Sequence, residues 1–190
     1  MDDPEIRQAL IRYLKQHAAG SPKIISEMAV CGGLARVDVA VISELLCGFE
    51  IKSDVDTLYR LPQQVECYNK TFDEVTAVVG EKYAEIIQEH IPPWWGIYKA
   101  QRTSGGEVEI VKVRDAQQNK NVDSMALLEL LWRCELLNLL RSENVKGFSN
   151  KNRRIIRKMA VENISDVKIK QFVVTALLQR PDWRMRTEGD

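Results

Sequence analysis

The sequence contains few of the residues that build zinc sites or disulfide frameworks. It has two histidines, and no two of its four cysteines form a CxxC pair; these are Cys31, Cys47, Cys67 and Cys134. Such scattered cysteines argue against a zinc knuckle and a disulfide-stapled scaffold, and they favour a reducing, intracellular setting. We therefore expect a cytoplasmic protein.

A net charge and a long apolar run are missing as well. The 27 basic residues balance the 27 acidic ones, so any attraction to a polyanion must come from a local cluster. No stretch approaches about 18 uninterrupted apolar residues, and the first ten residues lack the basic start and apolar run of a secretory signal. We expect a soluble protein without a membrane partner.

What the chain does have is enough apolar material for one sizeable core, since 45% of its 190 residues are hydrophobic. Asp3-Pro4-Glu5 is typical of a helix start, and the apolar stripe after it predicts a first helix to about residue 17. Beyond this helix the spacing of the apolar residues changes to one that is typical of strands. Residues 24–30, 35–42 and 45–52 predict an antiparallel meander whose first turn is Cys31-Gly32-Gly33.

Helical and extended patterns alternate after the meander. They predict a helix over 56–68 with Pro62 as an internal irregularity, a buried strand over 74–80, a helix over 82–90, and strands over 94–99 and 108–113. This order indicates an α/β sandwich. From about residue 123 only helices are predicted, over 125–140, 150–161 and 167–178. We therefore divide the chain into an α/β domain, 1–115, and a helical C-terminal region, 116–190.

Polar side chains interrupt the apolar strands of the meander. Asp38 lies between Val37 and Val39, where an ionised carboxylate needs a cation or strong hydrogen-bond donors beside it. Alternate residues of a strand share a face, so Glu50 and Lys52 project together. If the two strands pair, Asp38 can face Glu50.

This set of residue types suits phosphodiester hydrolysis. Two carboxylates on neighbouring strands form a hard, oxygen-rich site for Mg²⁺ or Mn²⁺. Such an ion polarises a phosphodiester and lowers the pKa of bound water. Lys52 could orient the attacking water or offset charge on the phosphorane. Glu27, on the first predicted strand, is a third carboxylate within plausible reach.

The spacing also resembles a known motif. Asp38, eleven residues and then Glu50-x-Lys52 resemble the D…(D/E)xK motif of the PD-(D/E)xK nuclease superfamily, the fold of many restriction endonucleases, although Val37 replaces its proline. Gln64-x-x-x-Tyr68 is similar to the QxxxY signature of nucleases related to the RecB exonuclease domain. Together these segments resemble a family of small bacterial proteins assigned to that superfamily, over about residues 5 to 100.

The resemblance implies a restriction-endonuclease-like core and a role for each motif residue. Asp38 and Glu50 would bind Mg²⁺ or Mn²⁺, with the Ile51 carbonyl as a further ligand, and Lys52 would be catalytic. Glu27 would assist as a ligand or by orienting the base. Gln64 and Tyr68 would line the substrate groove.

Several of these residues also have ordinary structural interpretations. A Glu-x-Lys pair on an exposed strand is usually a solvated ion pair, and a tyrosine at helical spacing is more often a core residue. Asp56 is better explained as an acidic cap of the helix expected to begin near Thr57. For Arg60, phosphate contact and ordinary solvation are equally plausible.

A basic segment lies outside the motif region. Residues 146–158 hold six basic residues and no acidic one, and they include Lys151, Arg153, Arg154 and Arg157. A helix there could contact phosphates through its basic face. A solvated face is the alternative, and we weigh the two equally.

We therefore expect a metal-dependent nuclease that cuts DNA in restriction, repair or phage defence. DNA is preferred over RNA because the resembled superfamily mostly cuts DNA. The alternative is a catalytically silent module on the same fold that binds nucleic acid or protein. In either case the leucine-rich segment 125–140 could dock a protein partner or a second copy. The sequence leaves the substrate form and the mode of cutting, endo- or exonucleolytic, open.

Overall fold

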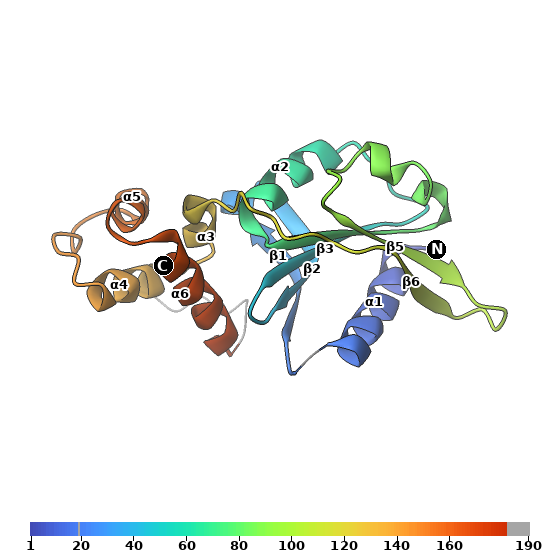
Figure 1. Ribbon diagram of the computed structural model, residues 1–190, viewed down its shortest axis with the longest axis horizontal. Coiled ribbons are helices and arrows are strands. Elements are labelled where there is room, and N and C mark those ends of the chain that lie inside the picture. Colours follow the sequence, from blue (N-terminus) through green and yellow to red (C-terminus); the bar gives the residue numbers. More distant parts are fainter. Residues whose placement is uncertain (19, 182–190) are drawn as a thin grey trace.

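The computed structural model describes residues 1–18 and 20–181, which form an α/β architecture with helices on both faces and at one end of a sheet (Figure 1). The chain opens with α1 (Asp3–His17). Asp2 accepts a hydrogen bond from the Glu5 amide, and the Glu5 carboxylate accepts one from the Asp2 amide, which caps the helix reciprocally. The first helix is thus confirmed.

Six strands form one mixed sheet in the order in which they occur along the chain. They are β1 (Lys23–Val30), β2 (Ala35–Ile42), β3 (Leu46–Lys52), β4 (Glu74–Val79), β5 (Gly96–Arg102) and β6 (Val108–Arg114). The first three strands form the expected antiparallel meander. β4 and β5 then continue the sheet in parallel, and β6 returns antiparallel at its edge.

The helix predicted over 56–68 forms later in the chain, as α2 (Leu61–Thr71). Pro62 lies in its first turn, where its missing N–H leaves no hydrogen bond unmade. The cap predicted for Asp56 is wrong, because its carboxylate accepts from the Ser53 amide and hydroxyl and closes a turn before the helix.

Two other helix predictions are corrected by the structure. Residues 82–90 form only two 3₁₀ turns, Glu81–Tyr83 and Ile87–Glu89, each of which buries a single side chain. A segment with so little to bury gains too little to offset the cost of helix nucleation.

The leucine-rich segment 125–140 is two helices, α3 (Ser124–Glu129) and α4 (Arg133–Ser142). The Glu135 carboxylate accepts a hydrogen bond from the Trp132 amide and so starts the second helix. The last two helices, α5 (Arg153–Asn163) and α6 (Asp166–Gln179), lie where the sequence predicts them.

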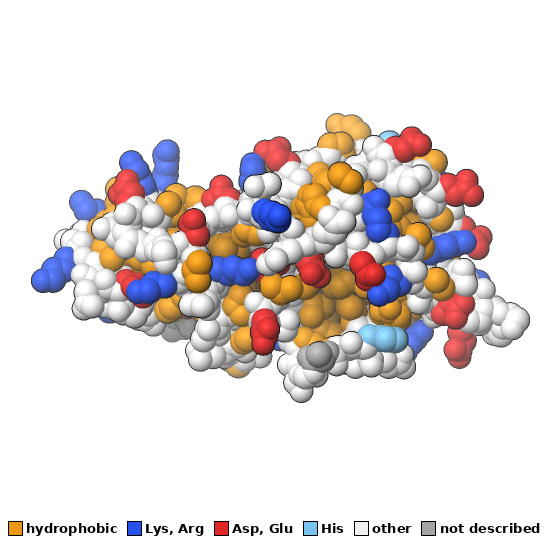
Figure 2. All heavy atoms as spheres, viewed as in Figure 1, with side chains coloured by type: hydrophobic (Ala, Val, Ile, Leu, Met, Phe, Trp, Pro, Cys, Tyr) orange, Lys and Arg blue, Asp and Glu red, His pale blue; other side chains and the backbone are white. Residues whose placement is uncertain are grey.

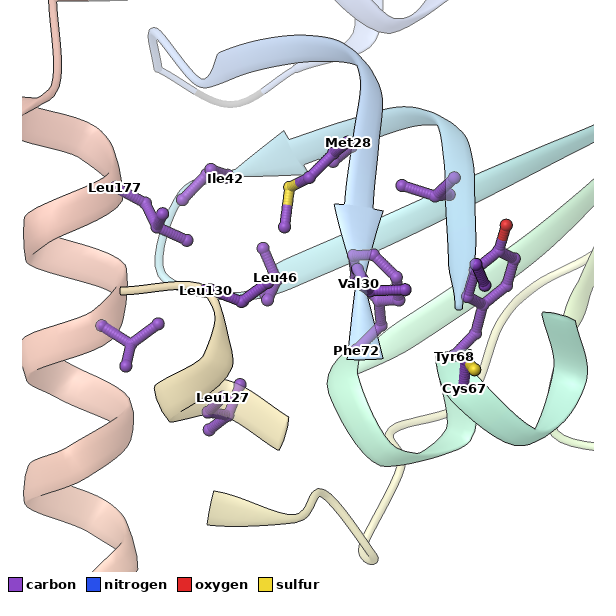
Figure 3. Close-up of a cluster of buried hydrophobic side chains, with 14 of the residues drawn as sticks. Met28, Val30, Ile42, Leu46, Cys67, Tyr68, Phe72, Leu127, Leu130 and Leu177 are labelled. Atoms are coloured by element: carbon purple, nitrogen blue, oxygen red, sulfur yellow. The ribbon is translucent and has the colours of Figure 1, made fainter. Parts of the chain in front are cut away.

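The sheet divides the apolar side chains into two cores. On one face α1 buries Ile6, Ala9 and Leu10 against the sheet. On the other face α2 covers the sheet, and this core continues without a break into the C-terminal helices. Figure 3 shows side chains of the meander, among them Met28 and Leu46, beside Leu130 and Leu177 of the helical region.

The helical region therefore begins after β6, as predicted, but shares a core with the sheet. In the part of the chain that the structure describes, no helix is long and apolar enough to cross a bilayer.

Candidate functional site

The site lies where β2 and β3 separate. Their ladder runs from Ile42 and Leu46 to Val39 and Phe49, and the structure records no further pair beyond that point. A polar cleft of about 400 Å³ occupies the opening. Its lining includes four residues named from the sequence as catalytic: Glu27, Asp38, Glu50 and Lys52.

Beyond the last backbone pair of β2 and β3, the Asp38 side chain forms the hydrogen bond between the two strands. Its Oδ2 accepts a hydrogen bond from the Ile51 amide at 2.7 Å, and its Oδ1 accepts one from Arg7 at 2.9 Å. Burial, and next the negative charge of Glu50, raise the pKa of Asp38 to about 8. The charge of Glu50 thus disfavours ionisation of Asp38, and the guanidinium of Arg7 opposes this effect.

Glu50 is enclosed by a network of donors. Its Oε1 accepts from Lys52 Nζ at 2.7 Å and from Gln64 Nε2 at 2.6 Å, and its Oε2 accepts from the Tyr68 hydroxyl at 2.6 Å. Lys52 also donates to Gln64 Oε1 at 2.9 Å. Burial raises the pKa of Glu50, while the Lys52 ammonium acts to lower it. α2 supplies Gln64 and Tyr68 because residues four apart lie on one face of a helix.

The two α2 residues differ in their access to the cleft. Gln64 is among the residues that line it. Tyr68 is fully buried and is not among the lining residues, and its hydroxyl, which has one hydrogen to donate, lies 2.8 Å from the Arg36 carbonyl as well as 2.6 Å from Glu50 Oε2. The structure therefore places Tyr68 behind Glu50 rather than in the groove.

Arg7 is a member of the site that the sequence does not reveal. Its Nε donates to Asp3 at 3.0 Å, and its Nη1 donates to the Asp38 carbonyl at 2.8 Å and lies 2.6 Å from a Glu27 oxygen. In α1 it looks like an ordinary polar residue beside an apolar stripe. Only the packing of α1 on the sheet, chiefly along β6 and β3, brings it to Asp38.

Glu27 holds an unusual backbone conformation. Its φ is +60°, in the left-handed region that side chains other than glycine rarely adopt. The pairs on either side of it place Glu27 opposite Asp38, and no ladder pair is recorded at that point. Ile25 and Met28, three residues apart, lie in the same core, whereas a regular strand would put them on opposite faces. The left-handed residue thus reverses the alternation of β1 at the site.

Two arginines stand at the rim of the cleft. Arg60, just before α2, lines the cleft and is exposed, which fits both phosphate contact and ordinary solvation. Arg36 was not predicted as a site residue, yet its side chain lines the cleft and is 65% exposed. It lies 3.6 Å from Glu27, a loose contact that leaves its outer face open to solvent.

The basic segment does not reach this cleft. Lys151, Arg153, Arg154 and Arg157 are absent from its lining. They lie in or just before α5, and Figure 2 shows Lys and Arg side chains projecting from that end of the molecule. Arg157 is half-buried and lies 3.9 Å from Glu129, so it is partly occupied within the bundle.

The oxygen atoms of the cleft fit a small hard cation. Within residues 1–18 and 20–181 no group of three or more Asp, Glu, His or Cys side chains is arranged as a metal site. The candidate ligands are two carboxylates, Asp38 and Glu50, and the Ile51 carbonyl. This set suits a Mg²⁺ ion, which usually keeps several waters.

Hydrogen bonding limits how each ligand could be used. The Glu50 Oε1 already accepts two hydrogen bonds, whereas Oε2 accepts only one and retains a lone pair. The Ile51 amide donates to Asp38, on the β2 side of β3. The Lys52 carbonyl accepts from the Gly80 amide, on the β4 side. Because backbone groups of successive strand residues point to opposite sides, the Ile51 carbonyl points toward β2, as its amide does. Asp38, the Ile51 carbonyl and Oε2 of Glu50 are therefore the available ligands.

Comparison with known proteins identifies relatives along almost the whole chain. The family model described as bacteriophage P4 protein cII matches residues 1–185. Protein cII of Enterobacteria phage P4 is 28% identical over 179 residues, which cover 94% of this chain and 67% of the phage protein. The similarity thus includes both the strands around the cleft and the C-terminal helices.

Proposed function

We propose that this chain, which belongs to the bacteriophage P4 protein cII family, is a Mg²⁺- or Mn²⁺-dependent nuclease that hydrolyses DNA phosphodiester bonds. The observation that carries the proposal is the meeting of Asp38, Glu50 and Lys52 at one opening between β2 and β3. The order of α1, the three-stranded meander, α2 and β4 also agrees with the restriction-endonuclease-like core implied by the motif resemblance.

The cleft separates a negative floor from a positive rim. Asp38 and Glu50 lie on the floor, and Arg36 and Arg60 at the rim are suited to hold phosphates of the strand on either side of the scissile bond. When bound, a divalent ion supplies Lewis-acid polarisation of the phosphate and a more acidic water. Asp38 and Glu50 would hold that ion together with the Ile51 carbonyl.

Lys52 is the residue placed to act on the reacting groups. Its ammonium lines the cleft and is held by Glu50 and Gln64 at 2.7 and 2.9 Å. From there its third N–H can orient the attacking water or offset charge on the phosphate oxygens. Gln64 and Tyr68 fix the Glu50 carboxylate, and Tyr68 does so without touching substrate.

A second candidate function is a nucleic-acid-binding module that does not cut. It is favoured by the closed network around Glu50, in which Lys52 and Gln64 use both lone pairs of Oε1 as a structural ion pair would. In that case the rim arginines and the basic face of α5 would make the contacts with DNA.

The decisive experiment is cleavage of supercoiled, linear and single-stranded DNA with Mg²⁺, with Mn²⁺ and with chelator. Wild type is compared with Lys52→Ala and with Lys112→Ala, a lysine that is exposed on β6 and pairs with Asp115. Metal-dependent cutting that is lost only in Lys52→Ala supports the nuclease. If folded wild type binds DNA but cuts no substrate with either metal, the binding module replaces it.

A further inference from the structure

The guanidinium of Arg7 is surrounded by acidic groups beside the proposed metal ligands. Asp3, Glu27 and Asp38 all contact it within 3.2 Å, and the Asp38 carbonyl contacts it too. An arginine has five N–H donors, and four of them make hydrogen bonds to Asp3 and Asp38, while Nη1 also lies 2.6 Å from a Glu27 oxygen. Its side chain is only 18% exposed. Arg7 is therefore directed at these carboxylates rather than at the open part of the cleft.

The carboxylates of Asp3, Glu27 and Asp38 require a positive charge between them, and Arg7 supplies it. Three carboxylates converge on one guanidinium, and Arg36 contributes only at 3.6 Å from Glu27 and from a solvated position. Without Arg7 the three carboxylates would repel one another in a half-buried setting. Carboxylate oxygens gathered in this way are also what a divalent ion requires.

The backbone of Glu27 is an independent observation that leads to the same residue. A left-handed conformation in a non-glycine strand residue persists only where surrounding contacts enforce it. The contacts of the Glu27 carboxylate are Arg7 at 2.6 Å and Arg36 at 3.6 Å. The strained residue is thus directed at the guanidinium rather than at Glu50 and the Ile51 carbonyl.

We infer that Arg7 is a positioning residue that takes the place of a second cation, so that the cleft accepts a single divalent ion. Arg7 neutralises Asp3 and Glu27 and fixes Oδ1 of Asp38, so the ion would bind Oδ2, which has one lone pair left beside the hydrogen bond from the Ile51 amide. In this arrangement Glu27 binds Arg7 and is not a metal ligand. The inference rests on the proposed function, because it assumes that Asp38 and Glu50 bind a divalent ion.

The test is a Mn²⁺ titration of the full chain, with free Mn²⁺ followed by electron paramagnetic resonance. We expect one ion per chain in wild type and a second ion in Arg7→Ala, since Asp3, Glu27 and Oδ1 of Asp38 lose the guanidinium that they share. Arg7→Lys, which restores the charge, should return to one ion. Arg12→Ala, an exposed arginine on the same helix, serves as the control and should also bind one.

A further variant keeps the test decisive if Arg7→Ala does not fold. Glu27→Gln should still bind one Mn²⁺ ion, because Glu27 serves Arg7; loss of that ion would overturn the inference. Two ions in wild type, or one ion in a folded Arg7→Ala, would overturn it as well while leaving the nuclease proposal intact. No Mn²⁺ bound by folded wild type would overturn both.

Discussion

At the scale of single residues, Asp38 links the stability of the protein to pH. Its pKa is about 8 in the folded chain and about 3.9 in an unfolded one, so the folded state binds more protons between these values. Its contribution to stability is therefore complete below about pH 4 and is lost as the pH rises toward 8.

Asp38→Asn removes this titration. We expect the unfolding free energy of the variant, relative to that of wild type, to increase as the pH rises from about 5 to about 8. Urea unfolding at each pH measures both free energies. Asp115→Asn, at an exposed aspartate of the β6 end, should show no such trend. A pH-independent difference for Asp38→Asn would contradict the raised pKa. Saturating Mg²⁺ should reduce the trend if Asp38 is a ligand.

Tyr68 tests whether a buried residue acts through Glu50. Tyr68→Phe keeps the ring but removes the donor to Glu50 Oε2, so we expect a loss of about 1.5–3 kcal/mol of unfolding free energy and weaker cleavage. Tyr83→Phe is the matched control, because its hydroxyl donates only to the Asp56 carbonyl. It should lower stability without lowering cleavage per folded molecule. If Tyr68→Phe and Tyr83→Phe cleave DNA equally, Tyr68 does not act on cleavage through Glu50.

At the scale of elements, the junction of β4, β5 and β6 has no room for an added methyl group. A Cβ on Gly96 would lie 2.7 Å from Thr76 Oγ1 and 2.9 Å from the Ala116 amide nitrogen. Because the latter is backbone, a side-chain rotation cannot relieve the contact. Gly96→Ala should therefore cost about 1–3 kcal/mol of unfolding free energy.

The matched control for this substitution is Gly105→Ala in the β5–β6 turn, where the nearest atom would be 3.7 Å away. Thermal unfolding followed by circular dichroism measures both variants. A Gly96→Ala midpoint equal to that of Gly105→Ala would show that the strands shift apart freely at this junction.

At the scale of the whole molecule, the sheet and the C-terminal helices are joined by one core and by an ion pair of the buried Asp73. Leu177 of α6 is fully buried in the core that also contains Met28 and Leu46 of the meander. Asp73, which accepts from the Leu46 amide, pairs with Lys170 of α6. We therefore expect the two regions to unfold together.

Leu177→Ala tests this coupling, because it should cost about 2–5 kcal/mol. In hydrogen exchange, peptides from α6 and from β2 should lose protection together. Leu178 is adjacent in the chain and 42% exposed, so Leu178→Ala should change neither the unfolding free energy nor the protection of these peptides. Loss of protection in α6 alone would instead support two domains, 1–115 and 116–190, that fold independently.

The sequence by itself determined the elements whose signals are local. The cap and proline of α1, the alternation of the meander, and the positions of Asp38, Glu50 and Lys52 on adjacent strands all follow from residues close together in the chain. The shared face of Gln64 and Tyr68 also follows from their spacing on one helix, but the sequence predicted that both would line a groove, whereas both contact Glu50 and only Gln64 lines the cleft.

Only the tertiary structure decided the rest, because it depends on contacts between distant segments. Arg7 became part of the site when α1 packed on the sheet, and Glu27 took a left-handed conformation that no local signal demands. The helix expected over 82–90 was reduced to two turns because it has little to bury, and the C-terminal helices joined the core of the sheet. Periodicity reports which face of an element is apolar, but not what that face will meet.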